Sequence, residues 1–167
     1  SFTANEQTGV HIQSHSFGLG TDLPLNPSDP FALPGLQDVG FSVNIGTSAP
    51  TDGNTFKQNV RAGIFLEALD YGTGSFQIRN NSISNTRNDA DLATAGDGIV
   101  VRLTNDLSPT EAVSLFSESI IDSNSIGVDD GGNEGNGLSF TMKQRTRIQD
   151  LQLTNTVFLN NGLDGFN

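Results

Sequence analysis

The sequence predicts an all-β chain whose short strands form stacked coils, a solenoid of about four to five coils with long loop insertions. Three observations lead to this fold class. A large apolar residue, an Asn three positions later and a Gly-apolar pair four positions after the Asn recur along the chain. Apolar residues around this pattern alternate with polar ones, which is the periodicity of strands. The spacing between copies varies, as it does when insertions leave a solenoid as loops.

Three copies of the pattern share one spacing: Phe2, Asn5 and Gly9-Val10; Phe56, Asn59 and Gly63-Ile64; Phe158, Asn161 and Gly165-Phe166. Two further copies carry insertions before the glycine. Ile83 with Asn85-Thr86 leads to Gly96-Asp97-Gly98-Ile99, and Ile120-Ile121 with Asn124 leads to Gly135-Asn136-Gly137-Leu138. Asn suits the polar corners of such a coil because it tolerates left-handed backbone, and Gly suits corners where a β-carbon would be blocked.

Each coil is expected to contain three short strands, joined by a polar corner, a glycine corner and a loop of variable length. Apolar pairs five residues before the large apolar position predict the first strand, at Phe76 and Ile78, Val113 and Leu115, and Leu151 and Leu153. The alternation after each glycine predicts the third, at residues 10–12, 64–66, 99–103 and 138–142. Stacking then predicts one interior column of Phe2, Phe56, Ile83, Ile120 and Phe158, and another of Val10, Ile64, Ile99, Leu138 and Phe166.

These residues resemble the repeats of right-handed parallel β-helix proteins of the pectin-lyase-like superfamily. The strongest local matches are Asn80-Asn81-Ser82-Ile83-Ser84-Asn85, Gly96-Asp97-Gly98-Ile99 and residues 160–166. The resemblance covers nearly the whole chain apart from a Pro-rich segment, and it implies a right-handed parallel β-helix. It implies no single activity, because that fold serves lyases, hydrolases, epimerases, adhesins and structural surface proteins.

Residues 1–167 are therefore expected to form one β-helix domain, as a segment of a larger solenoid. Residues 17–40 hold a cluster of prolines and are expected to leave the stack as a loop excursion. The chain begins and stops inside a coil, so the expected partners at its ends are flanking coils or further copies stacked head to tail. Over residues 110–118 the capping box Ser108-Pro109-Thr110-Glu111 favours a helix where the repeat favours a strand, and both interpretations stay open.

The charge balance limits the partners. The chain has 8 Lys and Arg against 19 Asp and Glu, a formal net charge of −11, so we expect no nucleic-acid partner. No apolar run approaches the roughly 20 residues that span a bilayer, so no membrane insertion is expected. The absence of Cys excludes disulfides and thiolate metal sites. A start at Ser1 without an initiator Met suggests a processed product, and together with the resemblance it indicates a secreted or cell-surface protein.

Polysaccharide lyases of the resembled superfamily hold calcium with clustered acids beside a basic residue. The acids to consider are Asp89, Asp91, Asp97, Asp129, Asp130 and Glu134, and the nearest bases are Lys143, Arg145 and Arg147. These acids do not recur at equivalent positions of successive coils. Of the hydrolase motifs, only the paired Asp and a loose Arg-x-Arg are present, with no Gly-His-Gly. His11 alternates with Val10 and Ile12 and is expected to face outward. We therefore expect no catalytic residues.

A candidate metal site remains in the loop of the fourth copy. Asp129, Asp130, Asn133 and Glu134 place several oxygen donors within six residues, the donor type that Ca²⁺ prefers. No EF-hand spacing is present, and a solvated acidic loop is the other interpretation. Calcium is thus an optional ligand, and no cofactor is required.

The leading functional hypothesis is an extracellular or cell-surface structural or interaction module without catalysis, such as an adhesin, sheath or filament component. The alternative is a β-helix that binds or degrades polysaccharide, as a lyase or hydrolase. An outward sheet face with acids, arginines and stacked aromatic residues would favour the alternative. A single Tyr and no Trp in the chain favour the module.

Overall fold

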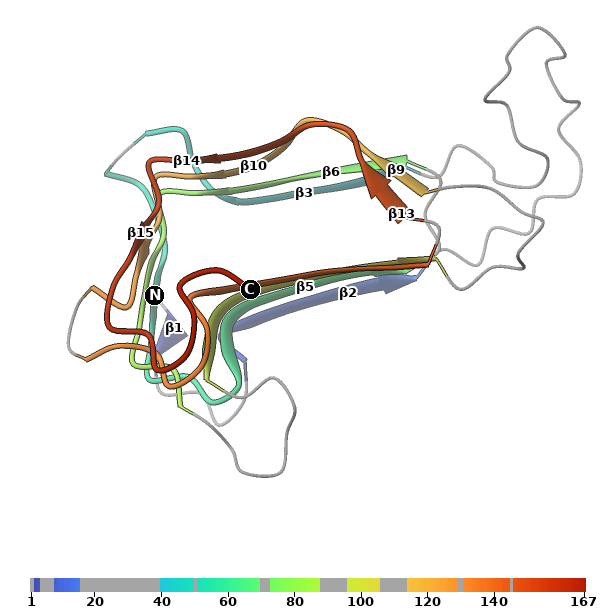
Figure 1. Ribbon diagram of the computed structural model, residues 1–167. Coiled ribbons are helices and arrows are strands. Elements are labelled where there is room, and N and C mark those ends of the chain that lie inside the picture. The colour runs from blue at the N-terminus through green and yellow to red at the C-terminus, as the bar shows by residue number, and fades with distance from the viewer. Residues whose placement is uncertain are drawn as a thin grey trace, which may run out of the picture.

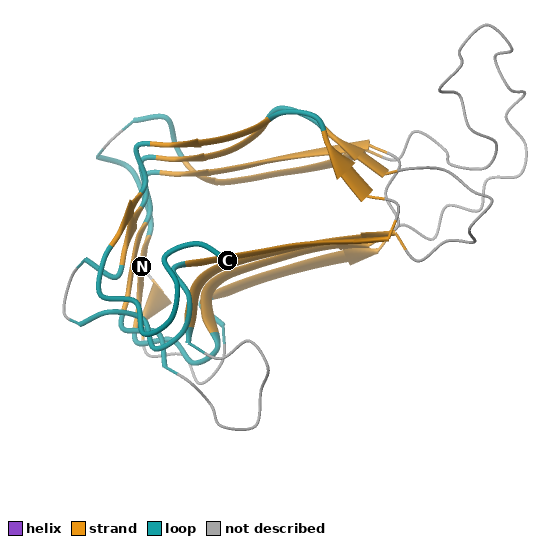
Figure 2. Cartoon of the chain, viewed as in Figure 1, coloured by secondary structure: helices purple, strands orange, loops and turns teal. Residues whose placement is uncertain are grey.

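A computed structural model describes residues 2–3, 8–15, 40–49, 51–69, 73–87, 96–105, 114–128, 131–144 and 146–167. Every regular element among these residues is a strand, and every strand pairing is parallel, so the predicted all-β class is confirmed (Figures 1 and 2). The strands are β1 (Phe2–Thr3), β2 (Val10–His15), β3 (Gly40–Gly46), β4 (Thr55–Lys57), β5 (Ala62–Leu69), β6 (Thr73–Arg79), β7 (Ser82–Ser84), β8 (Asp97–Asn105), β9 (Ser114–Phe116), β10 (Ser119–Asp122), β11 (Ser125–Ile126), β12 (Leu138–Gln144), β13 (Thr146–Ile148), β14 (Leu151–Thr154) and β15 (Val157–Phe158).

The strands form three parallel sheets. Sheet 1 has the order β1-β4-β7-β11-β15, and sheet 2 has the order β2-β5-β8-β12. In sheet 3, β6 pairs with β3 on one side and with β9 and β10 on the other, and these two strands pair in turn with β13 and β14. The chain visits sheets 3, 1 and 2 in the same cyclic order. We refer to each passage as a repeat: β1–β2, β3–β5, β6–β8, β9–β12 and β13–β15.

The first interior column is correct at four of its five predicted positions. Phe2, Phe56 and Ile83 lie in register on neighbouring strands of sheet 1. The next two residues in register are Ile126 and Phe158. The prediction of Ile120 was wrong, because Ile120 lies in sheet 3, where it pairs with Gln77 and Gln152.

The register of the second column is confirmed throughout, although its last member, Phe166, is exposed. Val10, Ile64, Ile99 and Leu138 are register partners in sheet 2, and a bridge adds Phe166. This column depends on the glycine that precedes each member. A Cβ at Gly63 would lie 2.4 Å from Cγ2 of Ile83 and 2.9 Å from the carbonyl oxygen of Gly98. The glycine corner is therefore a close approach between repeats, which a larger residue would force apart.

The strand predicted at Val113 and Leu115 is present in part, because β9 includes Leu115, but it does not supply the expected inward pair. Val113 lies outside the described residues, and Leu115 is exposed instead of buried. The residue that matches Ile78 in register is Ile121, which lies five residues before the true column member Ile126. The sequence pattern placed both the first strand and the column member of this repeat one corner too early in the chain, at Leu115 and Ile120 instead of Ile121 and Ile126.

The apolar core lies between the three sheets. Figure 1 shows sheet 3 opposite sheet 2, with sheet 1 across one side. The ring centroids of Phe76 in sheet 3 and Phe140 in sheet 2 are 6.3 Å apart, so the inner faces of the two sheets meet. Burying these side chains supplies the main stabilising free energy. The buried core residues are Phe41, Ile45, Phe56, Ile64, Leu66, Ala68, Phe76, Ile78, Ile83, Ile99, Val101, Leu103, Phe116, Ile121, Ile126 and Leu138.

Two further expectations concern loops. Residues 114–116 and 119–122 are strands, so the helix considered for residues 110–118 is wrong over its described part. Residues 110–113, and the Pro-rich segment up to residue 39, lie outside the described residues.

Candidate functional site

The predicted metal loop is described only in part. Asp129 and Asp130 lie outside the described residues. The side chain of Asn133 is buried, and its Oδ1 accepts hydrogen bonds from the backbone nitrogen and the hydroxyl of Thr86. Its Nδ2 donates to Oδ1 of Asn161 over 2.9 Å. Glu134 is exposed, and its backbone nitrogen donates to the carbonyl of Thr86. Asn133 therefore has a structural role whether or not a cation binds nearby.

The other acidic and basic residues considered as candidate site residues do not lie together. Asp97 is buried at the start of β8, where its Oδ1 accepts a 2.7 Å hydrogen bond from the backbone nitrogen of Asn136. Burial raises the pKa of this carboxyl, and the hydrogen bond to Asn136 opposes that shift. Lys143 lies in sheet 2 and Arg147 in sheet 3, while Asp89, Asp91 and Arg145 are outside the described residues. Among described residues, no group of three or more acidic or histidine side chains could hold a metal ion.

The polar corners form two rows of hydrogen bonds between repeats. At the corner from sheet 3 to sheet 1, Nδ2 of Asn54 donates to Oδ1 of Asn81 over 3.1 Å, and Nδ2 of Asn81 donates to Oδ1 of Asn124 over 3.0 Å. The backbone nitrogen of Asn124 donates to the hydroxyl of Thr156. At the corner after sheet 1, Asn133 and Asn161 continue the same direction of donation. Each row fixes the register of the repeats.

At most of these corners, the residue just before the Asn or Thr of the row has a left-handed backbone conformation. Asn80 has φ 54°, Ser123 has φ 55° and Asn155 has φ 47° at the first corner. Gln58, Asn85 and Asn160, with φ 56°, 54° and 52°, occupy the same place at the second. Asn adopts this conformation with less strain than most residues, which explains the Asn-Asn and Asn-Thr pairs in the sequence.

The last repeat presents an apolar surface, which we call the terminal face: Met142, Leu153, Leu163 and Phe166, with the half-buried Leu151 and Phe158 beside them. All of these residues except Leu163 have register partners that are buried one repeat earlier. Ile121 is 0% exposed, but its register partner Leu153 is 38% exposed. Leu138 is 1% exposed, and its partner Phe166 is 53% exposed. The positions that earlier repeats bury are open to solvent in this one.

The outward face of sheet 2 carries a short aromatic and charged strip. The His11 and Phe65 rings stack with centroids 4.5 Å apart and planes 3° apart. The guanidinium carbon of Arg102 lies 4.9 Å from the centroid of Phe65. Beside them, Nε2 of Gln13 donates to Glu67 over 2.6 Å. His11 is exposed, as its alternation predicted.

Comparison with protein-family models, with curated proteins and with solved structures gives no match in any of the three. In the described part of the chain, no helix has the length and apolar character to cross a bilayer.

Proposed function

We propose that this chain is a right-handed parallel β-helix module of a secreted or cell-surface assembly, that it works by association without catalysis, and that its terminal face receives a second copy head to tail. The β-helix assignment is supported by three parallel sheets that the chain visits in one cyclic order. Rows of Asn and Thr at the corners and columns of apolar residues inside are the interactions that hold such a stack together.

The exposure of inward positions in the last repeat carries the proposal. Phe166 and Leu153 occupy register positions that are fully buried one repeat earlier. Exposed apolar side chains at an unpaired sheet edge favour association, because burial gains about 25 cal/mol per Å² and the edge supplies ready hydrogen-bonding groups.

The backbone direction suits a second copy of this chain. Because every sheet is parallel, the edge at β14 and β15 and the edge at β1 and β3 present complementary sides of the same hydrogen-bonding pattern. Donation along the second polar row also runs toward the last repeat, from Asn133 to Asn161. Head-to-tail contact is heterologous, so it extends a filament unless the rotation closes a ring.

Charge limits the association to the ends. A net charge of −11 makes the lateral surfaces of two copies repel each other. The terminal face itself is mainly apolar. Calcium, bound at acidic loops such as the one with Asp129 and Asp130, would reduce lateral repulsion and is proposed as an optional ligand.

Light scattering coupled to size-exclusion chromatography tests the proposal, with the mass measured over a hundredfold range of concentration. We expect mass to rise with concentration for the unaltered chain, and to stay at one copy for the double variant Leu163→Glu, Phe166→Glu.

The matched control is Leu115→Glu. Leu115 is also 38% exposed, but its strand pairs on both sides and so lies away from the terminal face. A monomer at every concentration, with no binding of an apolar dye, would refute a second copy as the occupant. Monomers that bind the dye would instead favour flanking coils.

The strip on sheet 2 favours a second candidate, a polysaccharide-binding surface. Phe65 with Arg102, and Glu67 with Gln13, combine a ring edge, a cation and an acid on one face. The stacked rings of His11 and Phe65 cover each other, which reduces the ring surface left for a sugar.

Incubation with uronic-acid polymers, with and without calcium, tests both forms of this alternative, binding and degradation of polysaccharide. Binding lost in Arg102→Gln would support it, and release of unsaturated or reducing ends would support catalysis.

A further inference from the structure

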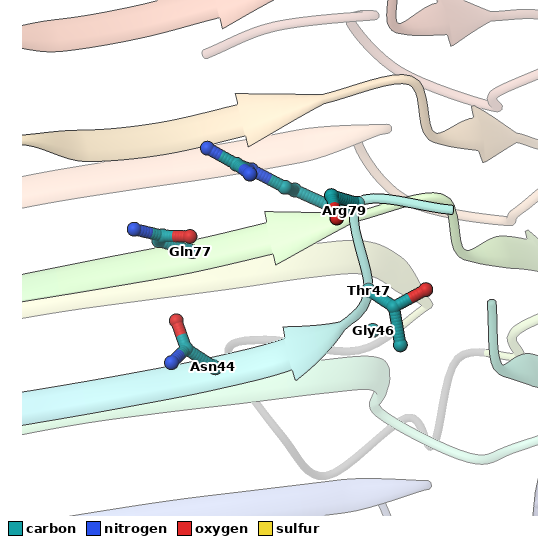
Figure 3. A pocket seen from close by; sticks show the side chains of 6 residues that line it. Asn44, Gly46, Thr47, Gln77 and Arg79 are labelled. Atoms are coloured by element: carbon teal, nitrogen blue, oxygen red, sulfur yellow. The ribbon is translucent and has the colours of Figure 1, made fainter. Parts of the chain in front are cut away.

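A polar cavity of about 260 Å³ lies on the outer face of sheet 3, at the end of β3 and β6 (Figure 3). Asn44 and Gln77 are register partners on these strands, and Arg79 follows Gln77 by two residues, so all three side chains belong to the outward face. The lining residues are Asn44, Gly46, Thr47, Ser48, Gln77 and Arg79, and none of them is acidic.

Arg79 is the charged group of this cavity. Its Nε–H is buried and donates to no acceptor among the described residues. The nearest acid in register is Asp122 on β10. The Asp122 carboxylate takes its hydrogen bonds from the other side, from the Thr154 hydroxyl over 2.6 Å and from Nδ2 of Asn155 over 3.1 Å. Asp122 moderates the positive potential without holding the guanidinium in an ion pair.

Two amides complete the donor set. Asn44 and Gln77 lie on adjacent parallel strands, about 4.8 Å apart, and neither side chain makes a hydrogen bond within the described residues. Figure 3 shows the Arg79 side chain extending back along β6 and away from β3, with Gln77 between its guanidinium and Asn44. The Arg79, Gln77 and Asn44 side chains therefore line the same cavity.

The rim of the cavity is fixed by backbone geometry. Gly46 has φ 89°, and a Cβ there would lie 1.8 Å from the carbonyl oxygen of Arg79, so only glycine allows β3 to end this close to β6. The carbonyl oxygen of Thr47 then accepts a 2.6 Å hydrogen bond from Nδ2 of Asn80. The turn that closes the cavity is thus held to β6.

We propose that this cavity binds a small oxyanion such as sulfate, phosphate or carboxylate, free or carried by a larger molecule. A guanidinium binds such groups through two parallel hydrogen bonds, and the amides of Gln77 and Asn44 supply further donors. The volume is below the roughly 300–1,000 Å³ of ordinary small-molecule sites, so the cavity fits one group and not a whole extended ligand. The inference is independent of the association proposed above.

Titration with sodium sulfate at constant ionic strength, followed by NMR of the backbone amides, tests this site. We expect saturable shifts confined to residues 44–48 and 77–80. Arg79→Gln should weaken binding by about tenfold or more, since charged hydrogen bonds are lost, and Gln77→Glu should weaken it by repulsion. Arg102→Gln is the matched control, because it removes the same charge from the outward face of sheet 2. Circular dichroism and the unfolding midpoint establish that each variant is folded.

Two further probes distinguish the sources of the anion. Glucose 6-sulfate binding tighter than inorganic sulfate would indicate an anion carried by a larger molecule, and equal affinities would indicate a free anion. Glucose without sulfate should produce no shift in either case. The proposal would be overturned by unsaturable shifts spread over the surface, or by an equal loss of affinity in Arg79→Gln and Arg102→Gln.

Discussion

The Oδ1 atom of Asn124 accepts two hydrogen bonds from Asn81, one from its backbone nitrogen and one from Nδ2, each 3.0 Å long. Nδ2 of Asn124 donates to the carbonyl of Ile78 over 2.8 Å. One buried side chain thus satisfies three polar groups of the preceding repeat, which no apolar residue could do.

Replacing Asn124 with Ala should therefore destabilise the fold. The change removes the acceptor of the Asn81 backbone nitrogen and one donor to the carbonyl of Ile78, and an unsatisfied buried group costs about 1–3 kcal/mol. Urea denaturation measures the loss. Gln13→Ala is the control, because its amide makes one exposed hydrogen bond, to Glu67, and its loss should be within about 0.5 kcal/mol. Equal stabilities of the two variants would contradict a structural role for the row.

The register of the fourth repeat gives the second prediction. Ile126 is fully buried in the column of Phe56 and Ile83, whereas Ile120 faces outward in sheet 3. Ile126→Ala should cost about 2–5 kcal/mol of unfolding free energy, and Ile120→Ala about 1 kcal/mol or less. The reverse order in denaturant melts would restore the column expected from the sequence.

The error at Ile120 has a physical origin. The Phe-Asn-Gly spacing correctly predicted the column members Phe56, Ile83 and Phe158, because in those repeats the polar corner follows the apolar residue directly. In the fourth repeat, residues 127–132 separate Ile126 from its row residue Asn133, while Asn124 belongs to the other corner. Both corners use a left-handed residue followed by Asn or Thr, so Asn124 alone could not show which corner it occupied.

The candidate sites were less predictable than the fold. Asn133 was expected to ligate calcium, and its position in the second polar row could have been found only by recognising that two rows exist. The cavity at Arg79 combines residues from β3 and β6 that are more than thirty positions apart, and no local motif marks it. Long-range register, which emerges from stacking, brings these groups together.

Gly63 gives a third prediction, on backbone approach. A Cβ there meets Ile83 at 2.4 Å and the carbonyl of Gly98 at 2.9 Å, so Gly63→Ala should cost about 1–3 kcal/mol through forced separation of two repeats. Gly165→Ala is the control, since the nearest atom to its added Cβ is Cβ of Phe158 at 3.3 Å. Thermal unfolding of the two variants should rank them in this order, and a Gly63→Ala protein as stable as the control would show that the repeats can separate freely.

Two carboxyls should respond to pH with opposite sign. Burial raises the pKa of Asp97 above 3.8, so the native state binds a proton more tightly than the unfolded chain, and this residue's contribution falls as pH rises from 3.8 through the native pKa. Asp97→Asn keeps an oxygen to accept from Asn136 and removes the buried charge, so it should be more stable than the unaltered chain at pH 7, with a difference that vanishes below pH 3.8.

Hydrogen bonding from Thr154 lowers the pKa of Asp122, so its contribution to stability is present above pH 3.8 and is lost as pH falls through the native pKa. Asp122→Asn should therefore be less stable than the unaltered chain at pH 7 and equal to it in acid. Urea denaturation of the three proteins from pH 3 to pH 8 measures both differences, and a shift of the same sign for the two variants at pH 7 would show that burial does not dominate at Asp97.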